Sequence, residues 1–140
     1  MVEKTKKYVD VNVFVYWLVS SDYTDRAKLW IQRIENSKYG EFCTSTITVY
    51  ETAVIIAGIT GKSLYERDFI EEIISAFRSL KQLMFIPLGG EDLLNVVDIM
   101  QRTDLDMEDA IHYISAKKVG ARIIISNDED FDETDLKREF

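Results

Sequence analysis

The sequence predicts an α/β fold in which a mainly parallel sheet is flanked by helices. Short runs rich in β-branched residues alternate along the chain with longer amphipathic stretches, a pattern typical of strands joined by crossover helices. The run at residues 122–126 is apolar enough to be buried on both faces, as strands of parallel sheets are. A hydrophobic content of 46% with a single proline excludes a disordered chain and predicts a sizeable core.

The first third of the chain predicts two strands and two helices. A strand at residues 8–11 leads directly into a short apolar helix at 13–19. A second helix is expected from Thr24, a residue type that caps helices, to Asn36, because apolar side chains recur there at helical spacing. A short second strand is then expected at residues 41–44.

The middle of the chain continues this alternation. Ser45 is a candidate N-cap for a third helix, which ends near the glycines at positions 58 and 61. Residues 63–80 carry an apolar stripe opposite a row of acids, so a fourth, amphipathic helix is expected there. A third strand is expected at residues 84–88, where Pro87 and two following glycines close it.

The last third predicts two further helices and the most strongly apolar strand. Helices are expected at residues 91–102 and 107–119, and Gly120 suits the position just after the second of them. The strand at 122–126 follows. The acid-rich residues 128–135 are expected to be mostly solvated surface.

Length and composition restrict the class of protein. A chain of 140 residues is expected to form one domain, residues 1–140. The net charge of −8 does not attract nucleic acid by electrostatics alone, so a phosphate-bearing substrate would need metal ions or a local basic patch. The one cysteine, Cys43, is expected to be a small buried residue in a reducing, cytoplasmic setting. The apolar residues near the N-terminus are too few for a signal or membrane-spanning segment.

Four carboxylates are candidate site residues because ligands of open parallel sheets bind beyond the carboxyl ends of the strands. Asp10 lies at the end of the first expected strand and Asp128 just past the last. Glu51 falls two turns into the third helix, and Asp109 falls in the first turn of the helix at 107–119. Four acids in one cleft repel one another unless a cation lies among them. Oxygen ligands without cysteine or histidine partners indicate Mg²⁺ or Mn²⁺, ions that assist phosphodiester hydrolysis.

Several of these residues also have a purely structural explanation. Asp106 suits a helix N-cap, and an acid three residues later, Asp109, suits the helix dipole. Glu51 has the alternative of an exposed helical acid, although its apolar neighbours favour burial. Asp10 is the strongest candidate, because an unpaired charge among apolar residues would be costly. His112, one turn after Asp109, is expected to be a surface or packing residue, with a general-base role as the alternative.

Four segments of the chain form an ordered set of motifs. They are residues 8–14, Glu51 in a helix after 44–46, residues 106–112 and residues 123–131. With these motifs the sequence resembles the PIN-domain nucleases from about residue 8 to residue 132, and is most similar among them to stand-alone VapC-type toxin ribonucleases. The resemblance implies an α/β/α sandwich with a mainly parallel sheet of four to five strands, which binds Mg²⁺ or Mn²⁺ and cleaves RNA.

The resemblance also assigns roles to individual residues. The catalytic metal ligands that it implies are Asp10, Glu51, Asp109 and Asp128, with Asn12, Ser126 and Asp130 in support. Ser126 stands where the family often has threonine, and Asn12 has the alternative of simply capping the following helix. Val11 departs from the small or hydroxylated residue that is common at its position. The last motif leaves open which of Asp128, Asp130 and Asp132 faces the metal.

The function expected from these features is metal-dependent endoribonuclease activity, as the toxin of a VapBC-type toxin–antitoxin pair. The expected partners are an RNA substrate, an antitoxin protein and a second copy of the chain. A PIN nuclease in RNA processing or ribosome maturation and a non-catalytic, partner-binding module are the alternatives. A phosphatase of the haloacid dehalogenase type is disfavoured, because Asn12 stands where that chemistry needs a second aspartate. The scattered basic residues predict weak RNA affinity without metal.

Overall fold

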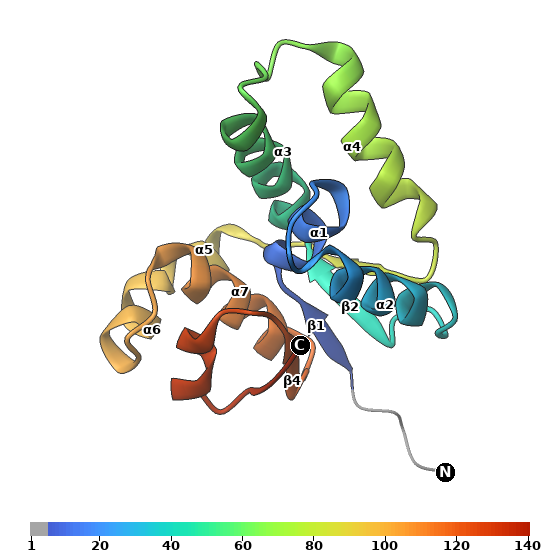
Figure 1. Ribbon diagram of the computed structural model, residues 1–140. Helices are drawn as coiled ribbons and strands as arrows, with labels where there is room; N and C mark the ends of the chain where they lie inside the picture. The colour runs from blue at the N-terminus through green and yellow to red at the C-terminus, as the bar shows by residue number, and fades with distance from the viewer. Residues whose placement is uncertain (1–5) are drawn as a thin grey trace.

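Five parallel strands form one sheet in the computed structural model, which describes residues 6–140 (Figure 1). The strand order is β3-β2-β1-β4-β5, so β1 lies at the centre. Residues 1–5 lie outside the described residues. They begin the N-terminal segment that is expected to carry no targeting signal. The strands are β1 (Lys7–Val9), β2 (Phe42–Ser45), β3 (Met84–Ile86), β4 (Ile123–Ile125) and β5 (Lys137–Glu139).

The central strands bury both of their faces, as the apolar run at 122–126 predicts. Tyr8 pairs with Ile124, and Val9 with Ile125, in the parallel register of β1 and β4. Because successive side chains of a strand point to opposite faces, the first pair enters one hydrophobic core and the second pair enters the other. All four side chains are fully buried.

Four helices build the first of these cores. Phe14 of α1 packs against Phe77 of α4, with ring centroids 4.8 Å apart, next to Val9 of the sheet. Figure 1 shows α3 and α4 side by side, extending away from the sheet. The helices of this layer are α1 (Val11–Leu18), α2 (Thr24–Glu35), α3 (Thr46–Thr60) and α4 (Arg67–Ser79).

The opposite face is covered by the C-terminal helices. Ile111 and Ala116 of α7 and Val96 of α6 bury against Tyr8 and Ile124. This layer consists of α5 (Gly90–Leu94), α6 (Val96–Arg102), α7 (Met107–Lys118) and the 3-10 helix η1 (Glu129–Glu133). Helices on both faces of a five-stranded parallel sheet confirm the predicted α/β/α sandwich.

Three predicted helix boundaries differ from the structure. Helix α1 begins at Val11 rather than at residue 13, because Asp10 and not Asn12 is its N-cap. Helix α4 begins at Arg67 rather than at residue 63, because the N–H of Ser63 donates to the Glu66 carboxylate at 2.6 Å and closes a turn. The single helix predicted over 91–102 is interrupted at Asn95, a residue type whose side chain competes with helical hydrogen bonding.

Most of the acid-rich segment 128–135 is exposed, as its composition predicts, but the end of the chain also contains buried residues and a strand. Phe131 is fully buried in the middle of η1, and Leu136 is buried just before β5. Strand β5 carries only Lys137, Arg138 and Glu139, so apolar periodicity does not reveal it. Charged residues suit this position, because β5 is an edge strand that pairs with β4 alone.

Two smaller expectations concern Cys43 and the membrane. Cys43 is fully buried in β2, as predicted, and burial raises the pKa of its thiol to about 12. The helices found in residues 6–140 include none that is both long enough and apolar enough to cross a membrane.

Candidate active site

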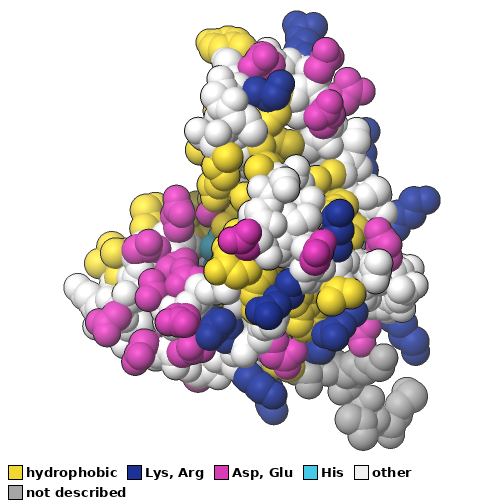
Figure 2. All heavy atoms as spheres, in the orientation of Figure 1, with side chains coloured by type: hydrophobic (Ala, Val, Ile, Leu, Met, Phe, Trp, Pro, Cys, Tyr) yellow, Lys and Arg dark blue, Asp and Glu magenta, His cyan; other side chains and the backbone are white. Residues whose placement is uncertain are grey.

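The candidate site lies in a hollow beyond the carboxyl ends of β1 and β4. Asp10 directly follows β1, and Asp128 caps η1 just after β4. Glu51 comes from the second turn of α3 and Asp109 from the first turn of α7. Figure 2 shows acidic side chains around the hollow between α3 and the α5–α7 layer, with a histidine at its floor. The fold therefore directs all four predicted acids towards one region.

Asp10 is 2% exposed and is held by hydrogen-bond donors. Its Oδ1 accepts the Val11 N–H at 2.8 Å, and its Oδ2 accepts the Ser126 hydroxyl at 2.6 Å. Asn12 Nδ2 donates to the same Oδ2 at 3.2 Å. Burial raises the pKa of Asp10, whereas the nearby His112 and the hydrogen bonds from Ser126 and Val11 act to lower it. The acid is thus buried with polar partners, as its apolar sequence setting predicts.

Ser126 connects Asp10 to the outer part of the site. While its hydroxyl donates to Asp10, the same oxygen accepts the Asp128 N–H at 3.0 Å and Asn12 Nδ2 at 3.2 Å. The Ser126 N–H donates to the carbonyl of Glu139 at 2.9 Å, which ties this residue to β5. Two of the predicted supporting residues, Asn12 and Ser126, therefore contact Asp10.

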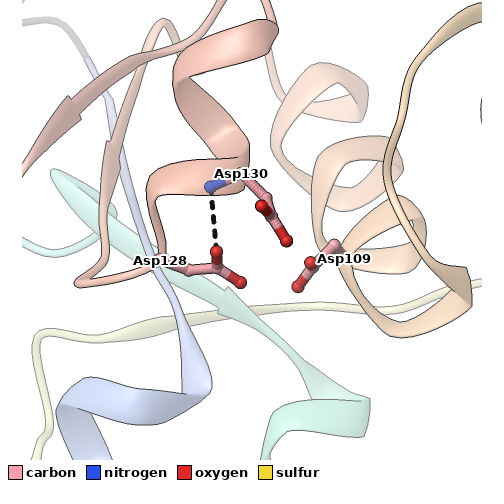
Figure 3. A group of neighbouring side chains, drawn as sticks. All are labelled: Asp109, Asp128 and Asp130. Carbon is pink, nitrogen blue, oxygen red and sulfur yellow. Dashed lines mark hydrogen bonds between the residues drawn. The ribbon is translucent and has the colours of Figure 1, made fainter.

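The outer part of the site is a group of three aspartates (Figure 3). Asp109, Asp128 and Asp130 each place a carboxylate oxygen within 4.8 Å of the others. Asp128 also accepts the Asp130 N–H at 2.9 Å. Asp106 caps α7 by accepting the Asp109 N–H at 2.9 Å, so the structural role predicted for that pair exists. It leaves the Asp109 carboxylate free to face Asp128.

The acid of the last motif that joins this group is Asp130 and not Asp132. Asp132 accepts hydrogen bonds from Arg138 Nε at 2.9 Å and Arg138 Nη2 at 3.1 Å. This pairing lowers the pKa of Asp132. Arg138 belongs to β5, the strand that the sequence pattern does not locate.

Negative charge is poorly compensated within the outer group. Burial and the neighbouring Asp128 raise the pKa of Asp109 to about 8. Asp128 also raises the pKa of Asp130. Glu108, which the sequence does not single out, lies nearby. Burial and, to a smaller extent, the charge of Glu51 raise the pKa of Glu108. A group of oxygen ligands in this condition fits a divalent cation.

The inner part of the site contains the residue that sequence reasoning undervalued. His112 is only 1% exposed, and its Nε2 lies 2.9 Å from Glu51 Oε1 and 3.6 Å from Asp10 Oδ1. The other ring nitrogen, Nδ1, lies 2.6 Å from the Tyr8 hydroxyl. His112 is therefore buried rather than on the surface, and it contacts two acids of the site in addition to packing in the interior. The available signal was its position one turn after Asp109, on the side of α7 that faces the site.

Comparison with known proteins identifies the fold family. A family model described as PIN domain matches residues 7–137, nearly the whole chain. The chain belongs to the PIN domain family. Ribonuclease VapC1 of Aquifex aeolicus is 25% identical over 134 residues, which cover 94% of this chain and 88% of that protein.

Solved structures agree with this PIN domain in fold. VapC20 of Mycobacterium tuberculosis, a toxin that cleaves the sarcin–ricin loop, superposes with a TM-score of 0.71 at 16% identity, covering 91% of this chain and 93% of its own. A toxin–antitoxin complex from Klebsiella pneumoniae has a chain that superposes with a TM-score of 0.63 at 18% identity, covering 94% and 99% of the respective chains. At these identities the agreement concerns the fold alone.

The stability of this PIN domain without divalent ions is expected to fall as the pH rises from 3.8 to about 8. The folded state keeps a proton on Asp109 up to about pH 8, whereas the unfolded chain releases it near 3.8. Stability is therefore lost across that interval, and the raised pKa of Asp130 acts in the same direction. Melting temperatures measured in chelator between pH 5 and 8 should decline in the parent protein and decline less in Asp109→Asn. An unchanged slope in the variant would contradict this assignment.

Proposed function

We propose that this PIN domain is a divalent-metal-dependent endoribonuclease that acts as the toxin of a toxin–antitoxin pair. The observation that carries the proposal is the meeting of carboxylates from β1, α3, α7 and the β4–η1 segment in one hollow. The similarity to a ribonuclease over 94% of the chain supports the same reaction class. In this proposal the site acids are Asp10, Glu51, Asp109 and Asp128, with Asp130 beside them.

The donor atoms of the outer group fit Mg²⁺ or Mn²⁺. All three side chains, Asp109, Asp128 and Asp130, offer carboxylate oxygens, which hard divalent cations prefer. Burial and then the neighbouring carboxylate of Asp128 raise the pKa of Asp109 to about 8, and a cation between these acids relieves their repulsion. We assign these three residues to metal binding, with Asp10 and Glu51 completing the site on its inner side. A bound ion supplies Lewis-acid stabilisation of the charge that develops on the phosphate during hydrolysis.

The chain itself supplies a site whose parts are already in position. Hydrogen bonds from Val11, Asn12 and Ser126 fix both oxygens of Asp10 in the folded protein. Ser126 also fixes the backbone of Asp128. Fixed charges and dipoles cost no reorganisation during the reaction, which is the main source of electrostatic catalysis.

The RNA phosphates need the metal for recognition as well as for chemistry. The chain carries a net charge of −8, and the hollow itself is edged by acids (Figure 2). A polyanion is repelled by such a surface in the absence of a cation. The proposal therefore includes weak RNA binding in chelator and stronger binding with Mg²⁺ or Mn²⁺.

Exposed hydrophobic surface supports the proposal that the chain binds two protein partners, a cognate antitoxin and a second copy of the chain. Large apolar side chains are exposed along α3 and in the loop after it (Figure 2). Exposed patches of this kind mark interaction surfaces in soluble proteins. These side chains are Tyr50, Val54, Ile59, Leu64 and Tyr65. Light scattering of the protein alone should detect a homodimer, and with the product of an adjacent gene it should detect a complex. Tyr65→Lys should weaken both assemblies. A monomer under both conditions would contradict the proposed partners.

The direct test of the enzymatic proposal is cleavage of a mixed RNA substrate by the purified protein. Cutting is expected with Mg²⁺ or Mn²⁺, and it should stop in EDTA and in the Asp10→Asn variant. Cutting that persists in EDTA would contradict the metal dependence. A protein that does not cut RNA with any metal would support the partner-binding alternative instead.

A further inference from the structure

The buried histidine lies between two acids that come from different parts of the chain. Nε2 of His112, on α7, is 2.9 Å from Glu51 Oε1 on α3 and 3.6 Å from Asp10 Oδ1 after β1. All three side chains are largely removed from water. In the described part of the chain, His112 is the one basic side chain with an ion-pair contact to either acid. It therefore connects three elements at the floor of the hollow.

Tyr8 connects His112 to the start of α3. The Tyr8 oxygen accepts the Ser45 N–H at 3.2 Å, where the chain enters α3. The same oxygen lies 2.6 Å from His112 Nδ1. The other ring nitrogen, Nε2, faces the carboxylates of Glu51 and Asp10, and two negative groups favour a proton on that nitrogen.

One oxygen of Glu51 stays without a partner in this arrangement. Glu51 Oε1 faces His112 Nε2, whereas Glu51 Oε2 is buried and accepts no hydrogen bond from any described residue. The contact between Nε2 and Oε1 is short but falls outside hydrogen-bond geometry. A buried carboxylate oxygen with no donor is costly, so it marks a position where a cation or another donor fits.

From this geometry we infer that His112 is a positioning residue that holds Glu51 and Asp10 together and leaves Glu51 Oε2 directed to a divalent ion. This inference rests on the proposed function, because it concerns the same metal site. His112 does not itself touch substrate, since it is buried and Tyr8 occupies its other nitrogen. It acts through the two carboxylates. Residues that contact metal ligands without binding the metal commonly orient those ligands in this way.

Substitutions at position 112 separate this role from simple packing. His112→Leu replaces the imidazole by an apolar side chain of moderate size and removes the N–H donor. His112→Gln restores an N–H donor near the position of Nε2. Ser115→Ala is the matched control, because Ser115 is buried one turn later on α7 and its hydroxyl donates only to the Ile111 carbonyl.

Mn²⁺ binding by titration calorimetry is the first measurement. His112→Leu should weaken Mn²⁺ binding by about 10- to 100-fold, the usual effect of losing a residue that orients metal ligands. His112→Gln should recover part of that loss, and Ser115→Ala should bind as the parent does. A folded His112→Leu protein that binds Mn²⁺ with the parent affinity would overturn the inference.

Nuclear magnetic resonance of the imidazole provides a second measurement that does not depend on metal or activity. His112 is the single histidine of the chain, so its ring ¹⁵N signals need no assignment. The proton should reside on Nε2 and exchange slowly with water. Its resonance should shift in Glu51→Gln. It should not shift in Asp98→Asn, because the exposed Asp98 carboxylate pairs with Arg102. A ring proton that exchanges rapidly and whose resonance does not change in Glu51→Gln would refute the positioning role.

The two measurements also separate this inference from the proposed function. A parent protein that neither binds Mn²⁺ nor cuts RNA would remove the proposed function, and the resonance would then decide the contact of His112 with Glu51. If His112→Leu does not fold, the parent and Glu51→Gln spectra decide the same question. A protein that cuts RNA but has an unprotected imidazole would keep the function and lose the inference.

Discussion

Asp10→Asn is expected to lower the rate of RNA cleavage by at least about 100-fold while leaving the protein folded. Asparagine has nearly the same volume, and its Oδ1 can still accept the Val11 N–H that caps α1. The variant loses the negative charge and one acceptor at the most deeply buried acid of the site. Cleavage rates with saturating Mn²⁺, compared at equal folded fraction by circular dichroism, measure this effect.

Asp132→Asn is the matched control for this experiment. Asp132 lies in the same acidic segment as Asp128 and Asp130, but it pairs with Arg138 instead of joining the outer group. Its substitution should leave cleavage within about twofold of the parent, because surface changes away from the site have small effects. Parent activity in Asp10→Asn, or a large loss in Asp132→Asn, would show that the charge needed for cleavage lies elsewhere.

Much of the fold was predictable from local patterns. The inner strand β4 is a continuous apolar run, and a strand buried on both faces has that composition. Asp10 was the most predictable site residue for a related reason, since a charge directly after an apolar strand needs partners. The structure provides them as Val11, Asn12 and Ser126. Local sequence was sufficient here because burial itself made the acid conspicuous.

The role of His112 was not predictable in the same way. Its partners Tyr8 and Glu51 are far from it in sequence, and helical spacing shows only that it lies one turn from Asp109. A buried polar contact between elements that are distant in sequence depends on which faces of α3, β1 and α7 meet. That information is tertiary, and a single sequence does not contain it in any periodic signal.

Strand β5 and the burial of Phe131 were missed because charge dominates the local composition. Nine of the last thirteen residues are charged, so the pattern indicates solvated surface. A single aromatic side chain is enough to fix such a segment when a core accepts it. This placement bears on the proposed metal site, because Arg138 of β5 pairs with Asp132, whereas Asp130 lies in the outer group.

Phe131→Ala is expected to lower the free energy of unfolding by about 3–5 kcal/mol, the usual cost of truncating a buried phenylalanine. Phe131 has no exposed surface and packs in the core that contains Tyr8, Ile124 and Ala110. It is also the apolar anchor of η1, the helix that Asp128 caps and that carries Asp130. Urea unfolding followed by circular dichroism gives the stability change directly.

The same substitution should affect metal binding in the fraction that remains folded. Without its anchor, η1 no longer fixes Asp128 and Asp130 opposite Asp109, so the stabilisation by Mn²⁺ should shrink. Leu94→Ala is the control, because Leu94 is 83% exposed on α5 and its truncation should change stability by less than about 0.5 kcal/mol. A Phe131→Ala protein with parent stability would mean that the acidic segment is held by its hydrogen bonds and the Arg138 pair. A destabilised variant that keeps the full Mn²⁺ effect would mean that Asp109 and the inner acids bind the ion without the two acids of this segment.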